Sequence, residues 1–203
     1  MAASERILIP GPAGAIEAVI DLPDAAPTAL ALVAHPHPLF GGTLDNKVAQ
    51  TLARVMVELG YVAARPNFRG VGGSEGTHDD GNGETDDLLA VIHAMRARTG
   101  LADAPLAMAG FSFGSLVLSR VAKRVAVERM VFVGAAVTRG HMESVPADTI
   151  VIHGEKDDTV PLESVMRWAE PQELPVTVIP GADHFFHRRL HVIRAIIKAA
   201  WRA

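Results

Sequence analysis

A serine flanked by two glycines stands where a predicted strand passes into a predicted helix. The segment reads Gly110-Phe111-Ser112-Phe113-Gly114 and completes the apolar run APLAMAGF. A sharp strand-to-helix turn lifts a serine hydroxyl clear of a sheet, and glycine at the flanking positions avoids clashes with neighbouring chain. The first amides of the helix would also face an anion forming beside the serine. The pattern predicts a nucleophilic Ser112, with a helix-capping serine as the alternative.

The two partners that such a serine requires follow later in the chain. A serine hydroxyl needs a histidine as general base, and that histidine needs a carboxylate to orient it. Asp157 and Asp158 follow the apolar run IVIHG, and His184 follows the apolar run VTVIPG. Taken singly, the aspartates could be solvated loop residues and His184 a helix cap. Together with Ser112, each after its own predicted strand, they indicate nucleophilic acyl transfer.

The elements that must position these residues alternate along the chain. Apolar runs predict strands at residues 15–22, 28–36, 61–68, 104–111, 127–136, 148–154 and 176–182. Apolar positions at helical spacing predict helices at 44–59, 84–98, from 113 onward, at 162–169 and at 185–203. Because parallel strands covered on both faces are apolar throughout, we expect an α/β fold with a mostly parallel sheet of about 7–8 strands. Residues 1–203 are expected to form a single domain.

Length and composition exclude several classes of protein. The chain has 203 residues, a net charge of −4 and no cysteine. Without cysteine there is no disulfide framework, no thiolate metal site and no cysteine nucleophile. The mildly acidic balance argues against a nucleic-acid-binding protein, and no apolar run is long enough to cross a membrane or to form a signal peptide. We expect a cytoplasmic protein that binds neither nucleic acid nor membrane, and the oligomeric state stays open.

Two other patterns in the sequence are typical of ligand sites. His187 and His191 are four residues apart in a predicted helix and could share a metal ion. Arg188 and Arg189 stand between them and would repel a cation, so we predict no metal. The segment RGVGGSEG from residue 69 lacks the G-x-G-x-x-G order of a phosphate-binding loop. We therefore predict no cofactor and interpret this segment as a structural loop near the rim of the active site.

Six segments together resemble the α/β-hydrolase superfamily, and more narrowly its small bacterial serine hydrolases without a lid. They are HPHPLFGGTLDNKV, RPNFRGVGGSEG, GETDD, AGFSFGS, HGEKDDTVP and GADHFFH, and the likeness covers nearly the whole chain. The resemblance implies Ser112 as nucleophile, Asp157 as acid and His184 as base, in the chain order of the superfamily. The absence of cysteine excludes the thiol nucleophile of dienelactone-hydrolase-like relatives.

The resemblance also implies an oxyanion hole made of two backbone amides. One is the Phe113 N–H, and the other comes from a loop where many members have His-Gly-x but this chain has HPHP from residue 35. Proline has no N–H, so we expect the His37 N–H as second donor and the Leu39 N–H as the next choice. Leu39, Phe40 and Phe185 are candidates for the substrate pocket and could equally belong to the core.

The resulting hypothesis is hydrolysis of a carboxylic ester-type bond in a small acyl substrate, through an acyl-enzyme intermediate. A peptidase or thioesterase would use the same residues, and a non-catalytic binding protein of the same fold is the other alternative. Only residues 137–147 separate two predicted strands at the place where many α/β hydrolases insert a lid. We therefore expect an open site.

Overall fold

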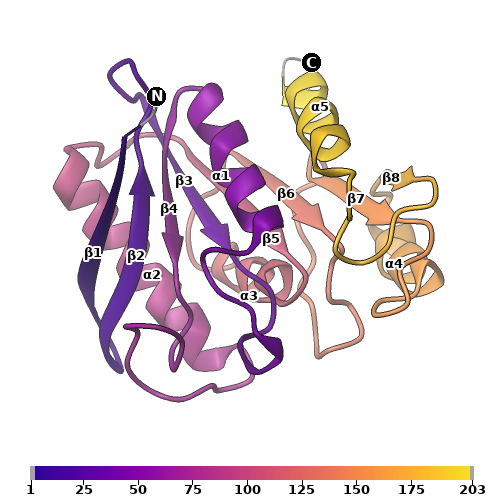
Figure 1. The fold of residues 1–203 in the computed structure, drawn as a ribbon, viewed down its shortest axis with the longest axis horizontal. Helices are drawn as coiled ribbons and strands as arrows, with labels where there is room; N and C mark the ends of the chain where they lie inside the picture. Colours follow the sequence, from indigo (N-terminus) through magenta and orange to yellow (C-terminus); the bar gives the residue numbers. More distant parts are fainter. Residues whose placement is uncertain (1–2, 202–203) are drawn as a thin grey trace.

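The structure is a computed structural model that describes residues 3–201. Its strands form one eight-stranded sheet (Figure 1). The strand order is β1-β2-β4-β3-β5-β6-β7-β8. The strands are β1 (Ser4–Gly11), β2 (Gly14–Asp21), β3 (Ala29–Ala34), β4 (Tyr61–Pro66), β5 (Leu106–Phe111), β6 (Arg129–Val133), β7 (Ile150–Gly154) and β8 (Val176–Ile179). Within the described chain β2 is antiparallel to β1 and β4, and the other neighbours are parallel. The predicted mostly parallel sheet is confirmed.

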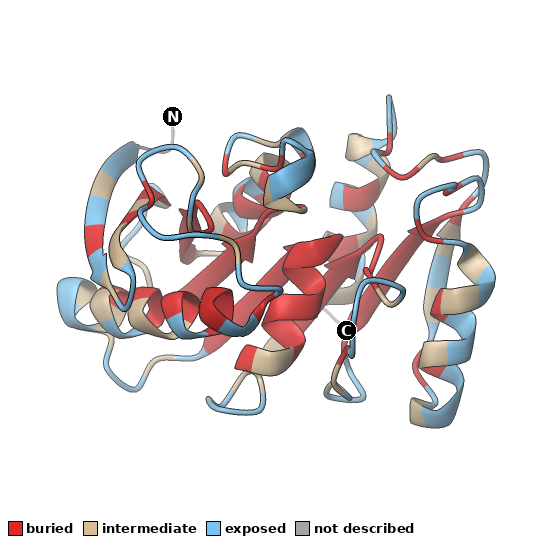
Figure 2. Ribbon diagram, turned by 90° about the horizontal axis from the view of Figure 1, so that it is seen from below, coloured by how far each residue is buried: buried red, intermediate tan, exposed pale blue. Residues whose placement is uncertain are grey.

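Helices cover both faces of this sheet. On one face lie α1 (Lys47–Glu58) and α5 (Leu190–Trp201), and on the other lie α2 (Asn82–Thr99), α3 (Phe113–Val121) and α4 (Leu162–Ala169) (Figure 1). Leu30 and Leu32 of β3 belong to the core on the α2 and α3 side, while Ala31 and Val33 belong to the core on the α1 side. Buried residues accordingly fill the sheet and the inner helix faces (Figure 2). Burial on both faces explains the unbroken apolar runs of the central strands.

Two elements differ most from the sequence prediction. The sequence predicts no strand at residues 4–11, where charged residues and Pro10 interrupt the apolar pattern. β1 forms there as the edge strand of the sheet, where the missing N–H of Pro10 costs little. Helix α5 begins at Leu190 and not at Phe185, because Phe186 and Arg188 have φ angles of 53° and 59°, outside the range of a right-handed helix. His187 therefore precedes α5, and the expectation that it shares a helix with His191 is wrong.

The carboxyl ends of the parallel strands bring the candidate site together. β4 pairs with one edge of β3 and β5 pairs with the other, so the strands that follow β3 are added first on one side of it and then on the opposite side. This makes β3 a topological switch point of the sheet. Ligands bind at such a switch point in parallel α/β sheets. The HPHP segment follows β3, Ser112 follows β5, Asp157 follows β7 and His184 follows β8.

The connection from β6 to β7, residues 134–149, contains no helix or strand, so no cap domain covers this edge. Among residues 3–201, no helix has both the length and the apolar character needed to cross a membrane.

Candidate active site

Ser112 occupies a strained turn between β5 and α3. Its φ of 52° and ψ of −119° lie outside the regions that residues with a side chain favour. The turn is held by a 3.0 Å hydrogen bond from the Ser112 N–H to the carbonyl oxygen of Val133. A Cβ atom on Gly110 would lie 2.6 Å from the Ser115 nitrogen, and one on Gly114 would lie 2.6 Å from the Ala34 carbonyl carbon. The two glycines are thus needed for close backbone packing around Ser112.

The imidazole of His184 lies between Ser112 and Asp157. Its Nδ1 is 2.7 Å from Asp157 Oδ2, and its Nε2 is 3.0 Å from Ser112 Oγ. A carboxylate only accepts hydrogen bonds, so Nδ1 carries the proton and Nε2 accepts from the serine hydroxyl. The Ser112 side chain makes no capping hydrogen bond to α3. The structure therefore brings the three predicted residues together and places the serine hydroxyl on the histidine rather than on the helix.

Asp157 is fixed by its own loop. Its Oδ1 accepts hydrogen bonds from the backbone N–H groups of Thr159 and Val160, at 3.0 and 2.8 Å. Burial raises the pKa of Asp157, but hydrogen bonds from His184 and from the Val160 N–H outweigh it and hold the pKa below its ordinary value. Asp157 thus stays ionised beside the imidazole. Its neighbour Asp158 is exposed, so only Asp157 of the two adjacent aspartates is buried beside His184.

A buried histidine anchors the loop after β3. His35 Nδ1 lies 2.6 Å from the Pro36 carbonyl oxygen and Nε2 accepts the Phe68 N–H at 2.9 Å. Burial lowers the pKa of His35 to about 4. A neutral ring satisfies both contacts, since Nδ1 donates and Nε2 accepts. His35 therefore shapes the loop that carries His37.

His37 and Phe113, the two candidate oxyanion residues, lie side by side. Their rings are 4.7 Å apart between centroids. Phe113 is the first residue of α3, where a backbone N–H has no partner within the helix. The Leu39 N–H, by contrast, points to His37 Nδ1 at 3.3 Å. This contact leaves His37 as the better candidate for the second amide.

A cavity of about 240 Å³ opens beside Ser112. Phe40 and Phe185 line it and are 70% and 51% exposed, so both stand at its mouth. Leu39 was expected there too but does not line the cavity, because the tight turn Pro38–Phe40 leaves its side chain 69% exposed. The structure thus brings two of the three pocket candidates to the site.

Known proteins with the same architecture and similar sequence identify the superfamily. A Xanthomonas campestris structure described as an α/β serine hydrolase without a lid is 35% identical, with 98% of this chain and 94% of that chain covered and a TM-score of 0.91. The chain belongs to the α/β-hydrolase superfamily. An α/β serine hydrolase homologue from Coxiella burnetii is 36% identical over 95% of both chains, with a TM-score of 0.84.

Two sequence comparisons agree with the assignment to the α/β hydrolases. The family model described as X-Pro dipeptidyl-peptidase (S15 family) matches residues 15–139. This match includes Ser112 and ends before Asp157 and His184. An uncharacterized protein of Rickettsia prowazekii is 32% identical over 195 residues, with 89% of this chain and 82% of that protein covered.

Two residues of this α/β hydrolase site were missed by sequence reasoning. His153 is the fourth residue of β7 and is fully buried against Asp157. Arg139 belongs to the β6–β7 connection and lines the cavity. The continuous apolar run of β7 masks His153. Arg139 carries no local signal because its neighbour Phe40 is remote in the sequence. His153 is the first residue of the HGEKDDTVP segment, and that position is the one clue that the sequence offers.

Proposed function

We propose that this α/β hydrolase is a serine hydrolase that cleaves a carboxylic ester through an acyl-enzyme intermediate. The observation that carries the proposal is the His184 ring, hydrogen-bonded to Ser112 Oγ on one side and to Asp157 on the other. A serine hydroxyl becomes nucleophilic when a base accepts its proton, and the base works when a carboxylate fixes its tautomer. Those are the two contacts that His184 makes.

In the first step Ser112 Oγ attacks the ester carbonyl carbon as His184 Nε2 takes the hydroxyl proton. The carbonyl π electrons move to the oxygen, and the N–H groups of Phe113 and His37 donate to this oxyanion. Each such donor contributes on the order of 3 kcal/mol to lowering the barrier. The C–O bond to the leaving alcohol then breaks, and His184 returns its proton to the departing oxygen.

Water completes the cycle by the same route. His184 takes a proton from a water molecule that attacks the acyl carbon, and the serine oxygen leaves with that proton. The site lies under no cap domain, so water has direct access to the intermediate. The aromatic rings of Phe111 and Phe185 pack at 5.1 and 5.3 Å from the His184 ring and limit its rotation between the two half-reactions.

An exopeptidase of the X-Pro dipeptidyl type is the second candidate, because the S15 family model matches this chain. Such an enzyme must bind the free ammonium group of a peptide close to the scissile bond, and a carboxylate suits that charge. Among the described residues that line the cavity beside Ser112, none is Asp or Glu. The charges of the cavity therefore favour an ester over an N-terminal dipeptide.

The test is a substrate panel of 4-nitrophenyl acetate, butyrate and octanoate, an acetyl thioester and an X-Pro 4-nitroanilide. We expect the short esters to give the highest kcat/KM and Ser112→Ala to lower kcat by at least about 10³-fold. Near-wild-type kcat in Ser112→Ala would rule out the proposed nucleophile. Preferential cleavage of the nitroanilide would instead support the peptidase.

A further inference from the structure

The cavity beside Ser112 contains one permanent charge, and that charge is positive. Arg139 lines the cavity with its guanidinium carbon 4.9 Å from the centre of the Phe40 ring. Stacking on an aromatic face leaves the in-plane N–H groups of a guanidinium available, and their spacing matches the two oxygens of a carboxylate. Contact with the Phe40 ring thus leaves the guanidinium N–H groups of Arg139 available to bind an anion.

A second groove, of about 610 Å³, adjoins the cavity and carries charge of the same sign. Asn46 and Phe185 line both, so the two hollows meet at these residues. The permanently charged residues that line the second groove are Lys47, at the start of α1, and Arg188, in the turn before α5. A substrate that leaves the cavity past Phe185 would pass these two cations.

Neither hollow contains a carboxylate to neutralise these cations. Within residues 3–201 no ion pair joins Arg139, Lys47 or Arg188 to an acidic side chain, and no Asp or Glu lines either hollow. Asp183, close to Arg188 in sequence, is hydrogen-bonded to the backbone and ring of His187 instead. Yet the chain as a whole has a net charge of −4. The permanently charged residues that line the two hollows are therefore all cations, although Asp80 and Glu84 act electrostatically on His37, and this lining would attract anions.

Resting on the proposed serine hydrolase function, we propose that the natural substrate is a short acyl ester bearing a carboxylate, which Arg139 binds. A cavity of about 240 Å³ is smaller than the sites of drug-sized ligands, so it suits a short acyl group. Lys47 and Arg188 add long-range attraction, and Arg139 supplies the direct contact. Arg139 then sets specificity without taking part in the bond changes at Ser112.

A pair of methyl esters of equal shape tests this inference. Monomethyl succinate carries a carboxylate where methyl 4-methylpentanoate carries an isopropyl group, and acid release can be followed in a pH-stat. We expect kcat/KM to be about tenfold higher for the succinate ester. Arg139→Gln should bring the ratio of the two kcat/KM values close to one, and Arg139→Glu should invert it. Lys47→Gln combined with Arg188→Gln should lower the ratio about twofold at low salt and less at high salt.

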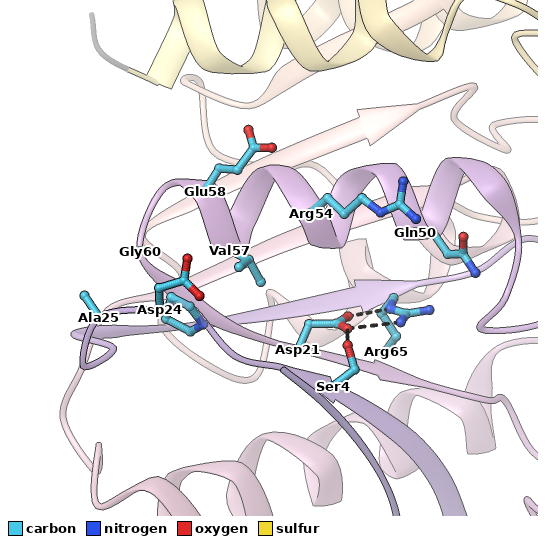
Figure 3. A pocket seen from close by; sticks show the side chains of 11 residues that line it. Ser4, Asp21, Asp24, Ala25, Gln50, Arg54, Val57, Glu58, Gly60 and Arg65 are labelled. Atoms are coloured by element: carbon cyan, nitrogen blue, oxygen red, sulfur yellow. Dashed lines mark hydrogen bonds and ion pairs between the residues drawn. The ribbon is translucent and has the colours of Figure 1, made fainter. Parts of the chain in front are cut away.

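The matched control is Arg54→Gln, which removes the same charge from a different groove. Arg54 is exposed on α1 and lines a hollow of about 760 Å³ that also contains the ion pair between Asp21 and Arg65 (Figure 3). This variant should leave the succinate preference unchanged. The wild-type protein and Arg139→Gln could instead show the same ratio of kcat/KM for the two methyl esters. If Ser112-dependent hydrolysis of the neutral ester is also observed, that result would overturn the carboxylate inference and leave the proposed serine hydrolase function intact. Absence of Ser112-dependent hydrolysis of both methyl esters and of the 4-nitrophenyl esters would overturn both proposals.

Discussion

His153 Nε2 lies 3.5 Å from Asp157 Oδ2, with both side chains shielded from solvent. The same nitrogen is 2.9 Å from the Val160 carbonyl oxygen. It therefore donates to that oxygen across the loop that carries Asp157. Burial lowers the pKa of His153, which keeps the ring neutral. His153 is thus a positioning residue for the carboxylate that orients His184.

We predict that His153→Leu lowers kcat about tenfold, because it removes one buried hydrogen bond from the Asp157 loop. His153→Gln retains an N–H donor at a comparable distance from the backbone and should restore most of the loss. KM should change little in both variants, since His153 lies behind Asp157 and away from the cavity. Steady-state kinetics of the three proteins checks this, and equal kcat for the leucine and glutamine variants would contradict a positioning role.

The strain at Ser112 predicts opposite effects of one substitution on activity and stability. Glycine adopts the φ of 52° without a side-chain clash, so Ser112→Gly should raise the free energy of unfolding by about 1 kcal/mol over Ser112→Ala. Both variants lose the proposed nucleophile. Urea unfolding of the two inactive proteins gives the comparison. A glycine variant no more stable than the alanine variant would show that the turn at Ser112 stores no strain.

Gly114→Ala should destabilise the fold by about 2–4 kcal/mol. Its new Cβ would lie 2.6 Å from the carbonyl carbon of Ala34, and this neighbour is backbone at the end of β3. Gly100→Ala is the control, since Gly100 has a φ of +69° but no atom within 4 Å of the added Cβ. That variant should lose only about 1 kcal/mol, from backbone strain. Equal losses of unfolding free energy would argue against tight packing around the turn at Ser112.

His35 predicts a loss of stability in mild acid. Its folded-state pKa of about 4 is lower than the ordinary histidine value, so between these values the unfolded chain binds more protons and stability falls as pH falls. The stability that this pKa difference contributes is fully present above about pH 6.5, and at pH 5 the free energy of unfolding is lower by about 2 kcal/mol. His35→Gln should be less stable than wild type at pH 7 yet lose less on going to pH 5. Urea unfolding at the two pH values measures this, and an unchanged pH dependence would exclude His35 as its source.

The fold and the order of the three candidate residues could be predicted because both depend on local patterns. Apolar runs of strand length, alternating with helical spacing, specify a parallel sheet, and its topology brings the carboxyl ends of β5, β7 and β8 to one edge. Ser112, Asp157 and His184 each follow such an end directly. Their meeting therefore follows from the sheet without knowledge of side-chain packing.

What could not be predicted depends on contacts between distant segments. Arg139 stacks on Phe40, almost a hundred residues earlier, and nothing in the β6–β7 connection indicates that contact. His153 reads as an ordinary position in an apolar strand until its ring is seen against Asp157. The start of α5 depends on the left-handed backbone of Phe186 and Arg188, which helix-forming patterns do not show.

Covalent labelling tests whether Ser112 is the nucleophile that forms the proposed acyl-enzyme. The wild-type protein is treated with a fluorophosphonate, its intact mass is measured, and the labelled peptide is mapped. We expect one adduct, on Ser112, with loss of ester hydrolysis in proportion to labelling. Ser112→Ala should take up no label, and His184→Ala should react far more slowly. Ester hydrolysis that persists in fully labelled protein, or an adduct on another residue that accompanies inactivation, would rule out Ser112 as the nucleophile.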